Sequence, residues 1–369
     1  MIEKKIIILC LVGQFGNGGT EKQLYLFLKY LDRSKYIPVV VVSTADTGAK
    51  WQDIIHNELQ INIHFLGSGP KPFKIARYVS ILCAIQPDLI FSWSFHTNAY
   101  YSFSFRRKFI GSLRGQFSMA KSELTIFHLK KSLSPPYFVV NSTMIQKELI
   151  DQGITPEKVN VISNIFEPEK ECSLGKSELR KQFGIRDDEI LVAGAGRNTP
   201  EKDFSFFVDV FSSACKIKRD LKAILIGSGG LGVKNKIKEL GLSDNIVLTG
   251  EVPYARKLLP CADIFFLSSI YEGMPNVLLE AIDSGCTPIA MNIGGVLDIL
   301  GNDNPHLECI IPPERDAMIV SKMLINLADN PNLRNKICHF NKDNRINQFK
   351  WDKIMPLYYN LFGTILNRI

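Results

Sequence analysis

The sequence predicts an α/β protein built from two domains, each with an open, doubly wound parallel sheet. Its 369 residues are enough for two domains of ordinary size, each with its own core. Short apolar runs such as 6–12, 190–193 and 263–267 have the composition of strands buried on both faces. A glycine-containing turn and a segment with helical periodicity follow these runs, an order typical of parallel sheets.

The composition argues against a disordered chain and against a membrane-spanning one. Hydrophobic residues make up 46% of the chain, which excludes disorder as its overall state, and no apolar run approaches the length of a membrane span. The apolar run at the N-terminus leads directly into a glycine-rich turn without a cleavage site. It therefore predicts a first buried strand, not a signal peptide.

The eight cysteines indicate a reducing, cytoplasmic environment. They form no C-x-x-C pair, and most stand among apolar residues, so neither a disulfide framework nor a zinc site is expected. They are Cys10, Cys83, Cys172, Cys215, Cys261, Cys286, Cys309 and Cys338.

The formal net charge of +7 suits acidic ligands or an anionic surface. Basic residues gather at 106–108, Lys121 and 130–131, close to Phe127 and Leu129. These clusters fit either a solvated surface or a face that touches phosphate-bearing lipid. No motif for reading nucleic acid is present, so we expect no nucleic-acid partner.

The first half of the chain contains alternating strands and helices. Strands are expected at 6–12, 39–42, 61–66, 87–91, 110–113, 137–140 and 159–162, and helices after 21, at 50–60 and at 74–85. Ser142 is placed to cap a helix after the sixth of these strands. The polar stretch 167–177 is expected to be the interdomain linker.

The second half repeats this alternation. A helix is expected at 176–183, strands at 190–193, 223–226, 246–252, 263–267 and 287–291, and a last helix at 351–366.

The stretch 268–281 contains the residues that most clearly indicate a binding site. Glu272 follows a buried strand within a glycine-containing turn, and Glu280 lies about two helical turns further on. Free N–H groups at that helix start suit an anion or hydroxyl groups, although a plain βα unit with surface carboxylates is the alternative.

The phrase S-x-x-E-G-x-P-x-x-x-x-E-A over residues 269–281 resembles the donor-site signature of retaining, nucleotide-sugar-dependent glycosyltransferases of family 4, also called group 1. The resemblance implies the GT-B fold, in which two Rossmann-like domains face a central cleft. It implies an acceptor domain at 1–166, a donor domain at 178–350 and a C-terminal helix at 351–369 that crosses back to the first domain. It covers nearly the whole chain.

The resemblance also implies a donor site. Gly194–Asp203 resembles the family's G-R-x-x-x-x-K motif, so Arg197 and Lys202 would hold the diphosphate. Glu272 would bind a hydroxyl of the donor sugar, and Glu280 would bind the ribose. The other implied donor-binding residues are Gly18, Gly19, Gly227, Gly229, Glu251, Gly273, Met274, Pro275, Asn276 and Val277.

On the acceptor side, the resemblance points to three residues of the first domain. His96 and Asn98 match the later part of a histidine-containing turn, and Arg114 follows the next strand. The family's earlier histidine is replaced here by Ser92 and Trp93, and the usual glycine after Asn164 is Ile165. The implied catalytic residues are His96, Arg197, Lys202 and Glu272.

The implied reaction is sugar transfer, with retention, from a nucleoside-diphosphate sugar (UDP is the expected base) to a hydroxyl of a lipid-linked saccharide. The setting would be capsule or O-antigen synthesis in bacteria, in the cytoplasm or at the inner face of its membrane. No D-x-D motif is present, so no metal or other cofactor is expected. The alternatives are a nucleotide-sugar epimerase or hydrolase, and an inactive sugar- or nucleotide-binding partner protein.

Overall fold

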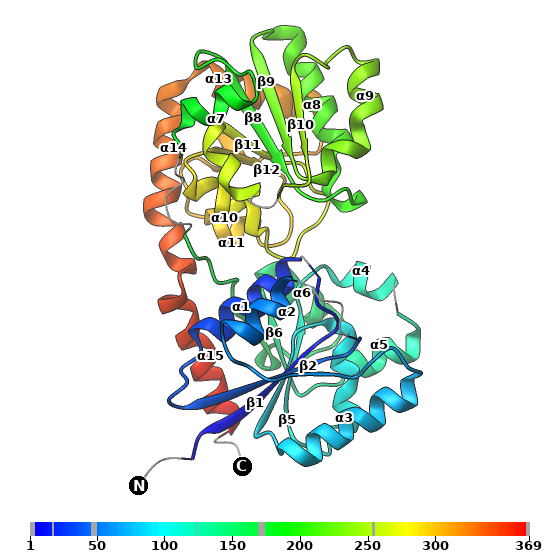
Figure 1. The fold of residues 1–369 in the computed structure, drawn as a ribbon. Coiled ribbons are helices and arrows are strands. Elements are labelled where there is room, and N and C mark those ends of the chain that lie inside the picture. The colour runs from blue at the N-terminus through cyan, green and yellow to red at the C-terminus, as the bar shows by residue number, and fades with distance from the viewer. Residues whose placement is uncertain are drawn as a thin grey trace. The chain divides into compact units, whose positions relative to one another are not determined.

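The computed structural model describes residues 4–16, 18–45, 50–122, 124–168, 174–252 and 255–366. The chain divides into two compact units, shown in Figure 1. Unit 1 contains Met1–Ile165 and Phe349–Ile369, and unit 2 contains Phe166–Gln348. Each unit has its own parallel sheet, so the predicted α/β class is confirmed. The middle of the predicted linker and Cys172 lie outside the described residues.

Unit 1 is built on a seven-stranded parallel sheet with the order β3-β2-β1-β4-β5-β6-β7. Its strands are β1 (Ile6–Val12), β2 (Tyr36–Val42), β3 (Ile63–Phe65), β4 (Leu89–Ser92), β5 (Lys108–Leu113), β6 (Tyr137–Val140) and β7 (Val159–Val161). Its helices are α1 (Gly19–Tyr30), α2 (Lys50–Asn57), α3 (Lys71–Ile85), α4 (Phe117–Ser122), α5 (Ile126–Ser132), α6 (Thr143–Asp151) and α15 (Trp351–Leu366), with the 3-10 helices η1 (Phe95–Phe103) and η2 (Pro156–Lys158).

The side chains of β1 alternate between two apolar layers, as the two-residue period of a strand requires. Ile8, Cys10 and Val12 belong to the core shared with α1 and α15, whereas Leu9 and Leu11 belong to the core shared with α3. Figure 1 shows α1 and α3 on different sides of this sheet. The strand is therefore buried on both faces, which explains its uninterrupted apolar sequence.

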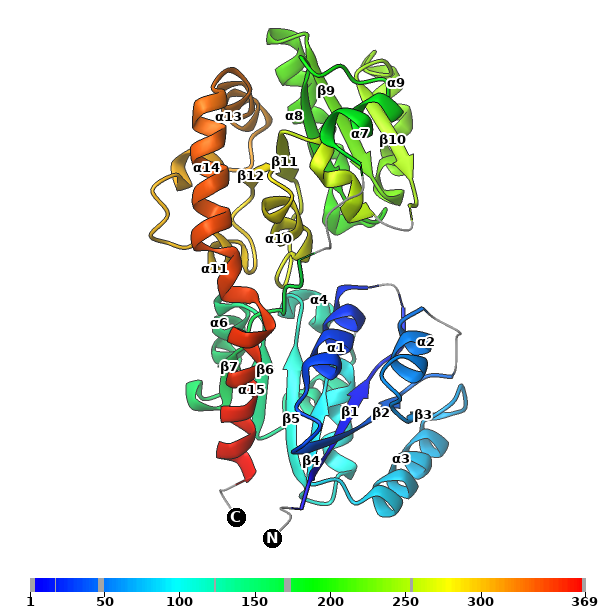
Figure 2. The same cartoon turned by 60° about the vertical axis from the view of Figure 1, so that its left-hand side comes forward.

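The C-terminal helix α15 completes the core of unit 1 (Figure 2). Tyr358 and Phe362 make edge-on contacts with Phe27 of α1 at ring-centroid distances of 5.0 and 6.2 Å. Tyr359 stacks on Tyr36 at 5.5 Å. These aromatic rings give the last helix a large apolar face that is buried in the core of unit 1. The expected return of the C-terminal helix to the first domain is thus confirmed.

Unit 2 is built on a five-stranded parallel sheet with the order β10-β9-β8-β11-β12. Its strands are β8 (Ile190–Ala195), β9 (Leu221–Ile226), β10 (Ile246–Gly250), β11 (Ile264–Leu267) and β12 (Thr287–Ala290). Its helices are α7 (Lys176–Gln182), α8 (Phe204–Ile217), α9 (Lys234–Glu239), α10 (Asn276–Asp283), α11 (Val296–Leu300), α12 (Leu307–Ile310), α13 (Ala317–Asp329) and α14 (Pro331–Asn344). The 3-10 helices are η3 (Pro200–Lys202), η4 (Ser228–Val233), η5 (Ala255–Cys261) and, at the boundary of the units, η6 (Ile346–Phe349).

Several predicted elements of unit 1 have different bounds in the structure, and β2 and α2 show why. Strand β2 begins at Tyr36 and includes Pro38, which pairs with Ile8 of β1. On its other side β2 pairs with β3 only from Val40 onward, so Pro38 has no strand neighbour there. Proline is tolerated at such a position because a strand with one unpaired edge has fewer N–H groups to satisfy. Helix α2 ends at Asn57, before Gln60, whose φ of 53° is left-handed.

Both sheets have a switch point, where the strand order reverses and ligands of open α/β sheets bind. In unit 1 it lies between β1 and β4, and in unit 2 between β8 and β11. The loops that follow β8 and β11 contain Lys202 and Glu272, so the topology brings the two main predicted donor residues to one edge of the sheet.

A buried arginine holds α7, β8 and β11 of unit 2 together. Arg180 is 2% exposed and donates to the backbone oxygens of Cys261 and Glu189 at 2.9 and 3.1 Å and to the Asp263 carboxylate at 2.6 Å. Burial alone would raise the pKa of Asp263. Lys176, the Leu191 N–H and Arg180 outweigh burial and hold that pKa below its ordinary value of 3.8.

We expect Asp263→Asn to lower the free energy of unfolding at pH 7 by about 3 kcal/mol, because it leaves a buried guanidinium without its counter-charge. The depressed pKa means that the carboxylate stabilises the fold above pH 3.8 and loses this contribution as the pH falls through the lower, folded-state pKa. The difference between variant and wild type should therefore shrink in that acidic range. Urea unfolding at several pH values measures it.

Asp188→Asn is the matched control, because Asp188 also pairs with an arginine, Arg186, at 3.0 Å, but on the exposed surface. We expect no measurable change in unfolding for this control. An equal effect of the two substitutions would contradict a structural role for the buried pair.

Candidate functional site

The loop after β11 brings a lysine and a glutamate of unit 2 into direct contact. Lys202 Nζ lies 2.5 Å from Glu272 Oε1, and Ser269 Oγ donates to the same carboxylate oxygen at 2.9 Å. Both charged side chains keep some exposure, 18% for Lys202 and 14% for Glu272. The two residues are 70 positions apart in sequence, so only the parallel sheet makes them neighbours.

Glycine fixes the backbone around Glu272. Gly294, after β12, has a φ of 48°, and a Cβ there would lie 2.0 Å from the Glu272 carbonyl oxygen. The next residue, Gly295, donates its N–H to the carbonyl of Gly273 at 2.8 Å. The turn after β12 therefore supports the loop that carries Glu272, and a side chain at Gly294 would displace it.

A second glycine contact joins the loops after β8 and β9. A Cβ at Gly227, where φ is 98°, would lie 2.5 Å from the carbonyl oxygen of Gly196. Gly229 donates its N–H to that same oxygen at 3.1 Å, and a Cβ at Gly229 would clash with the Phe204 ring. The predicted glycine turn thus packs backbone to backbone against the loop that contains Arg197.

Two charged residues of the predicted donor site point away from the protein. The side chains of Arg197, after β8, and Glu251, after β10, are exposed, and we find no partner for either within the described residues. Unlike Lys202, which is already paired with Glu272, Arg197 can bind an incoming anion without first breaking an ion pair.

Helix α10 begins at the end of the Glu272 loop. Its N-cap, Pro275, provides no side-chain cap, and Gly273, Met274 and Pro275 are buried. Glu280 lies on the same helix, half-buried, about one turn beyond the helix start at Asn276 and eight residues after Glu272. The helix start at Asn276 and Val277 lies at the carboxyl edge of the sheet, where N–H groups of a first turn have no acceptor within the helix.

Arg315 is a residue of this site that the sequence analysis missed. Its guanidinium donates to the carbonyls of Ser268 and Ser269 at 2.7 and 3.1 Å and to the Asp203 carboxylate at 2.6 Å. Its Cζ also lies 4.1 Å from the centroid of the Phe206 ring. Asp203 directly follows Lys202 and caps α8, so Arg315 links the loops of Lys202 and Glu272. No motif marks this arginine, because its partners are mostly backbone atoms.

In unit 1, the loops at the switch point bring His96 to the glycine-rich turn. Gly13 donates its N–H to Ser94 Oγ at 3.0 Å, and a Cβ at Gly13 would lie 2.2 Å from His96 Nε2. The His96 residue is exposed as a whole, but its ring loses hydration against this turn. That desolvation, followed by the influence of the nearby His128, lowers the pKa of His96 below its ordinary value. His96 is therefore neutral at pH 7.

The predicted Gly18 and Gly19 begin α1, with Gly18 as its N-cap. The Glu21 carboxylate folds back over Gly18, because a Cβ at Gly18 would lie 2.5 Å from a Glu21 oxygen. The preceding residue, Asn17, lies outside the described residues.

The structure gives Asn98 a bracing role instead of the expected acceptor-side role. Its side chain is fully buried, donates to the Ser112 carbonyl and accepts from the Ser112 N–H, both at 3.0 Å. Both polar ends of the amide are therefore used to hold η1 against β5. Asn98 has no surface at which an acceptor could bind.

Arg114 also has partners within unit 1. Its guanidinium lies over the Trp93 ring at 4.1 Å and donates to the Tyr358 hydroxyl of α15 at 3.2 Å. Trp93 is 1% exposed and packs against Phe27 and Phe91, so the residue that replaces the family's histidine is a core side chain.

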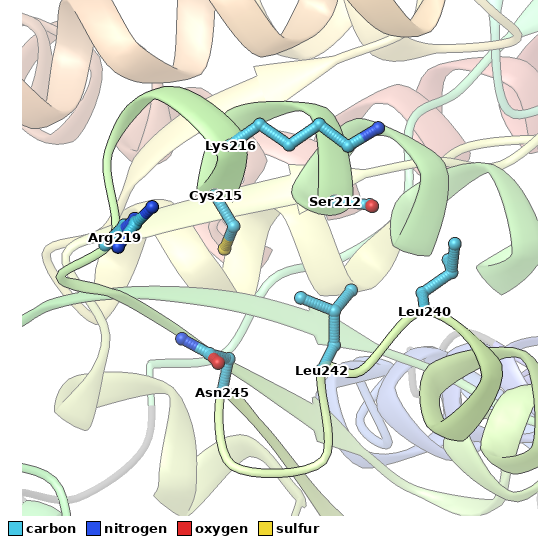
Figure 3. Close-up of a pocket in the computed structure, with 7 residues that line it drawn as sticks. All are labelled: Ser212, Cys215, Lys216, Arg219, Leu240, Leu242 and Asn245. Carbon is cyan, nitrogen blue, oxygen red and sulfur yellow. The ribbon is translucent and has the colours of Figure 1, made fainter.

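A cavity of about 530 Å³ lies elsewhere in unit 2, at the amino ends of β9 and β10 (Figure 3). It contains none of the predicted site residues. Its lining residues are Ser212, Cys215, Lys216, Arg219, Leu240, Leu242 and Asn245. Burial raises the pKa of the Cys215 thiol to about 12, which makes this cysteine unreactive near neutral pH.

Two family models match the chain and together span most of it. The model described as Glycosyltransferase Family 4 matches residues 17–170, and the model described as Glycosyl transferases group 1 matches residues 175–343. The Glu272 loop and the Lys202 loop both lie within the second match.

Individual proteins agree with these matches. An uncharacterized glycosyltransferase of Methanocaldococcus jannaschii is 25% identical, over 60% of this chain and 58% of that protein. The UDP-Gal:alpha-D-GlcNAc-diphosphoundecaprenol alpha-1,3-galactosyltransferase of Escherichia coli is also 25% identical, over 56% of each chain. The chain thus matches little more than half the length of these relatives.

Among solved structures, HepE of Anabaena in complex with UDP superposes with a TM-score of 0.81 at 19% identity, covering 98% of this chain and 99% of that one. At this identity the likeness establishes the fold alone, two Rossmann-like domains of the GT-B type. The fold and the two family matches together show that this chain belongs to the family 4, group 1 glycosyltransferases.

Proposed function

We propose that this protein is a retaining glycosyltransferase that moves a sugar from a nucleoside-diphosphate sugar to a hydroxyl of a lipid-linked saccharide. The observation that carries the proposal is the contact of Lys202 with Glu272 and Ser269 at the switch point of unit 2. A cation for phosphate and a carboxylate for sugar hydroxyls are thereby ready at the same edge of the sheet.

The donor would occupy the carboxyl edge of this sheet. Arg197 and Lys202 would bind the diphosphate, so that Lys202 exchanges its contact with Glu272 for a phosphate oxygen. The released Glu272 would accept hydrogen bonds from a sugar hydroxyl, with the backbone of 273–277 beside it. Glu280 would hold the ribose, and Gly227, Gly229 and Glu251 would line the nucleoside. The family resemblance also assigns Gly18 and Gly19 to the donor.

The leaving diphosphate gains negative charge in the transition state, so the two cations would stabilise the transition state more than the ground state. This is the work that a divalent metal does in other phosphate-transferring sites, and we therefore propose that the reaction is metal-independent. No carboxylate is assigned as nucleophile; a donor phosphate oxygen would accept the acceptor proton on the same face of the sugar. Neutral His96 would contribute a hydrogen bond near the reacting sugar.

We propose a UDP-sugar as donor, a hexosyl group as the transferred sugar, and a bacterial capsule or O-antigen pathway as the setting. The support is that HepE was solved with UDP and with UDP-glucose, and that the Escherichia coli relative is named for a UDP donor and an undecaprenol-linked acceptor. Such an acceptor would place the protein at the inner face of the cytoplasmic membrane. No helix within the described residues is long and apolar enough to cross a membrane.

The alternative is an inactive sugar- or nucleotide-binding protein. Two departures from the family pattern, at Trp93 and Ile165, favour it, but both residues have a role in packing. Trp93 is part of the core, and Ile165 is 3% exposed with its backbone N–H and C=O bonded to the buried Gln23 side chain at 2.7 and 2.9 Å. Both departures therefore have a packing role within unit 1.

The first test is donor binding. A ligand that binds only the folded state raises the melting temperature. We expect a UDP-sugar to raise the Tm, and the increase to survive EDTA. GDP-, ADP- and dTDP-sugars serve as comparisons in the same thermal-shift measurement. An increase that EDTA abolishes would contradict metal independence, and no increase with any nucleotide sugar would contradict the donor site.

The second test separates the two charges of the pair. Lys202→Ala should weaken binding of both UDP and UDP-sugar by about 10- to 100-fold, the usual effect of losing one charge-assisted hydrogen bond. Glu272→Gln should weaken binding of the UDP-sugar alone, because UDP lacks the sugar that Glu272 would contact. Titration calorimetry measures all four affinities.

Lys218→Ala is the control for this test, since Lys218 also forms an ion pair, at 3.1 Å with Asp329, but at the amino end of β9, opposite the edge that carries the site. Its affinities should equal those of the wild type. Equal losses for UDP and UDP-sugar in Glu272→Gln would refute the sugar role of Glu272.

The third test concerns Arg315 as a positioning residue. Arg315→Ala should reduce the preference for UDP-sugar over UDP, because the loop that carries Glu272 loses two backbone contacts. If Arg315 acts through Glu272, the same substitution should have little further effect on this preference in Glu272→Gln, since coupled residues are non-additive. Full additivity in the double-mutant cycle would rule out this coupling. Arg315→Lys, which keeps the charge and one donor group, should restore part of the preference.

A further inference from the structure

The excess positive charge of this protein comes from one segment of unit 1. Residues 89–147 hold eight of the chain's 44 lysines and arginines but one of its 37 acidic residues, so 36 of each sign remain for the rest of the chain. Residues 89–147 therefore carry a formal charge of +7, and the rest of the chain has a formal net charge of zero. Such a concentration on one segment creates a local positive potential that a uniform distribution would not.

Three large apolar side chains are exposed within this segment. Ile126 and Phe127 at the start of α5 are 76% and 70% exposed, and Phe105, in the turn between η1 and β5, is 63% exposed. Figure 1 shows α5 at the surface of unit 1. Single exposed apolar residues are common, but three that stand beside Arg106, Lys130 and Lys131 in the sequence form an amphipathic surface. We call Phe105, Arg106, Ile126, Phe127, Lys130 and Lys131 the aromatic-basic surface.

Contacts between α5 and η1 hold this surface together. Lys131 Nζ lies 4.6 Å from the centroid of the Phe127 ring and 5.1 Å from that of Phe103, at the end of η1. The His128 ring donates from Nε2 to the backbone oxygen of His96, at the start of η1, at 3.0 Å. The aromatic-basic surface is therefore connected directly to the residue proposed to act near the acceptor.

The two exposed residues Phe105 and Arg106 lie in a turn with a strained backbone. Phe105 and Arg106 both have left-handed backbones, with φ of 51° and 57°. This conformation is costly for residues with a Cβ and is maintained only where the surroundings enforce it. The enforcing residue is Ser104, which is fully buried and hydrogen-bonded to the Tyr78 hydroxyl at 2.8 Å and the Tyr100 carbonyl at 2.9 Å.

We propose that the aromatic-basic surface docks unit 1 on a membrane whose lipid head groups are anionic. Basic side chains attract the negative surface, and aromatic and aliphatic side chains beside them enter the boundary between head groups and acyl chains. The exposed apolar residues favour a bilayer over a purely electrostatic partner such as nucleic acid, and the excess of positive charge selects anionic lipid. The choice of partner rests on the proposed lipid-linked acceptor, which this surface would bring near His96.

The test is co-sedimentation of the full-length protein with vesicles of phosphatidylcholine alone or with 30% phosphatidylglycerol. The wild type should bind the anionic vesicles and not the neutral ones. Arg106→Glu/Lys130→Glu should weaken binding at least twentyfold, since each basic residue near an anionic membrane contributes about fivefold. Ile126→Ser/Phe127→Ser should weaken binding to the anionic vesicles at least tenfold. The reason is that the two apolar side chains are no longer there to enter the boundary between head groups and acyl chains.

Two variants of unit 2 are the matched controls. Ile217→Ser removes an apolar side chain that is 61% exposed, and Lys234→Glu/Lys238→Glu reverses two charges on α9; neither should change vesicle binding. An equal loss of vesicle binding in the control variants would overturn the proposal that this surface docks on a membrane. Absence of wild-type binding to anionic vesicles would also overturn it, and would favour an acidic protein as the partner. The UDP-induced thermal shift, measured on the same samples, reports folding and the donor site separately.

Discussion

The close approach of backbone segments at the carboxyl edge of the second sheet is the constraint on which the candidate site depends. Gly227 lies against the Gly196 carbonyl, and Gly294 lies against the Glu272 carbonyl, each with a left-handed φ. A Cβ at either position would push one loop away from the next. Because these loops cannot separate, the side chains of Lys202 and Glu272 meet with fixed geometry, and Arg315 adds three charge-assisted or backbone contacts that tie both loops together.

The contact between Lys202 and Glu272 has a functional meaning in this arrangement. The two side chains neutralise each other, which lowers the cost of keeping two partly buried charges. A ligand with adjoining phosphate and hydroxyl groups would satisfy both at once, whereas phosphate alone would leave Glu272 unpaired. Under the proposed function, the pair would therefore favour ligands in which a phosphate is joined to a sugar.

Unit 1 shows how a departure from a family pattern can be structural. Trp93 stands where the family has a histidine, and it fills the core between Phe27 and Phe91 while its ring supports the Arg114 guanidinium. Arg114 in turn reaches the Tyr358 hydroxyl of α15. The same residues therefore anchor the C-terminal helix, and the substitution serves packing within unit 1. His96 is exposed as a residue, and its ring lies against Gly13 of the glycine-rich turn.

The sequence alone determined the class of fold, the alternation of strands and helices and the position of the Glu272 loop, because buried strands, glycine turns and helix periodicity are local signals. It also identified Lys202 and Glu272 by motif, though not their contact. Only the tertiary structure decided the roles of Asn98, Arg114 and Arg315. Asn98 is buried against β5, Arg114 is held by an aromatic ring and a helix from the end of the chain, and Arg315 binds carbonyl groups 46 and 47 residues away. Contacts to backbone atoms and to distant elements leave no pattern in the sequence, which is why no reading of motifs could assign them.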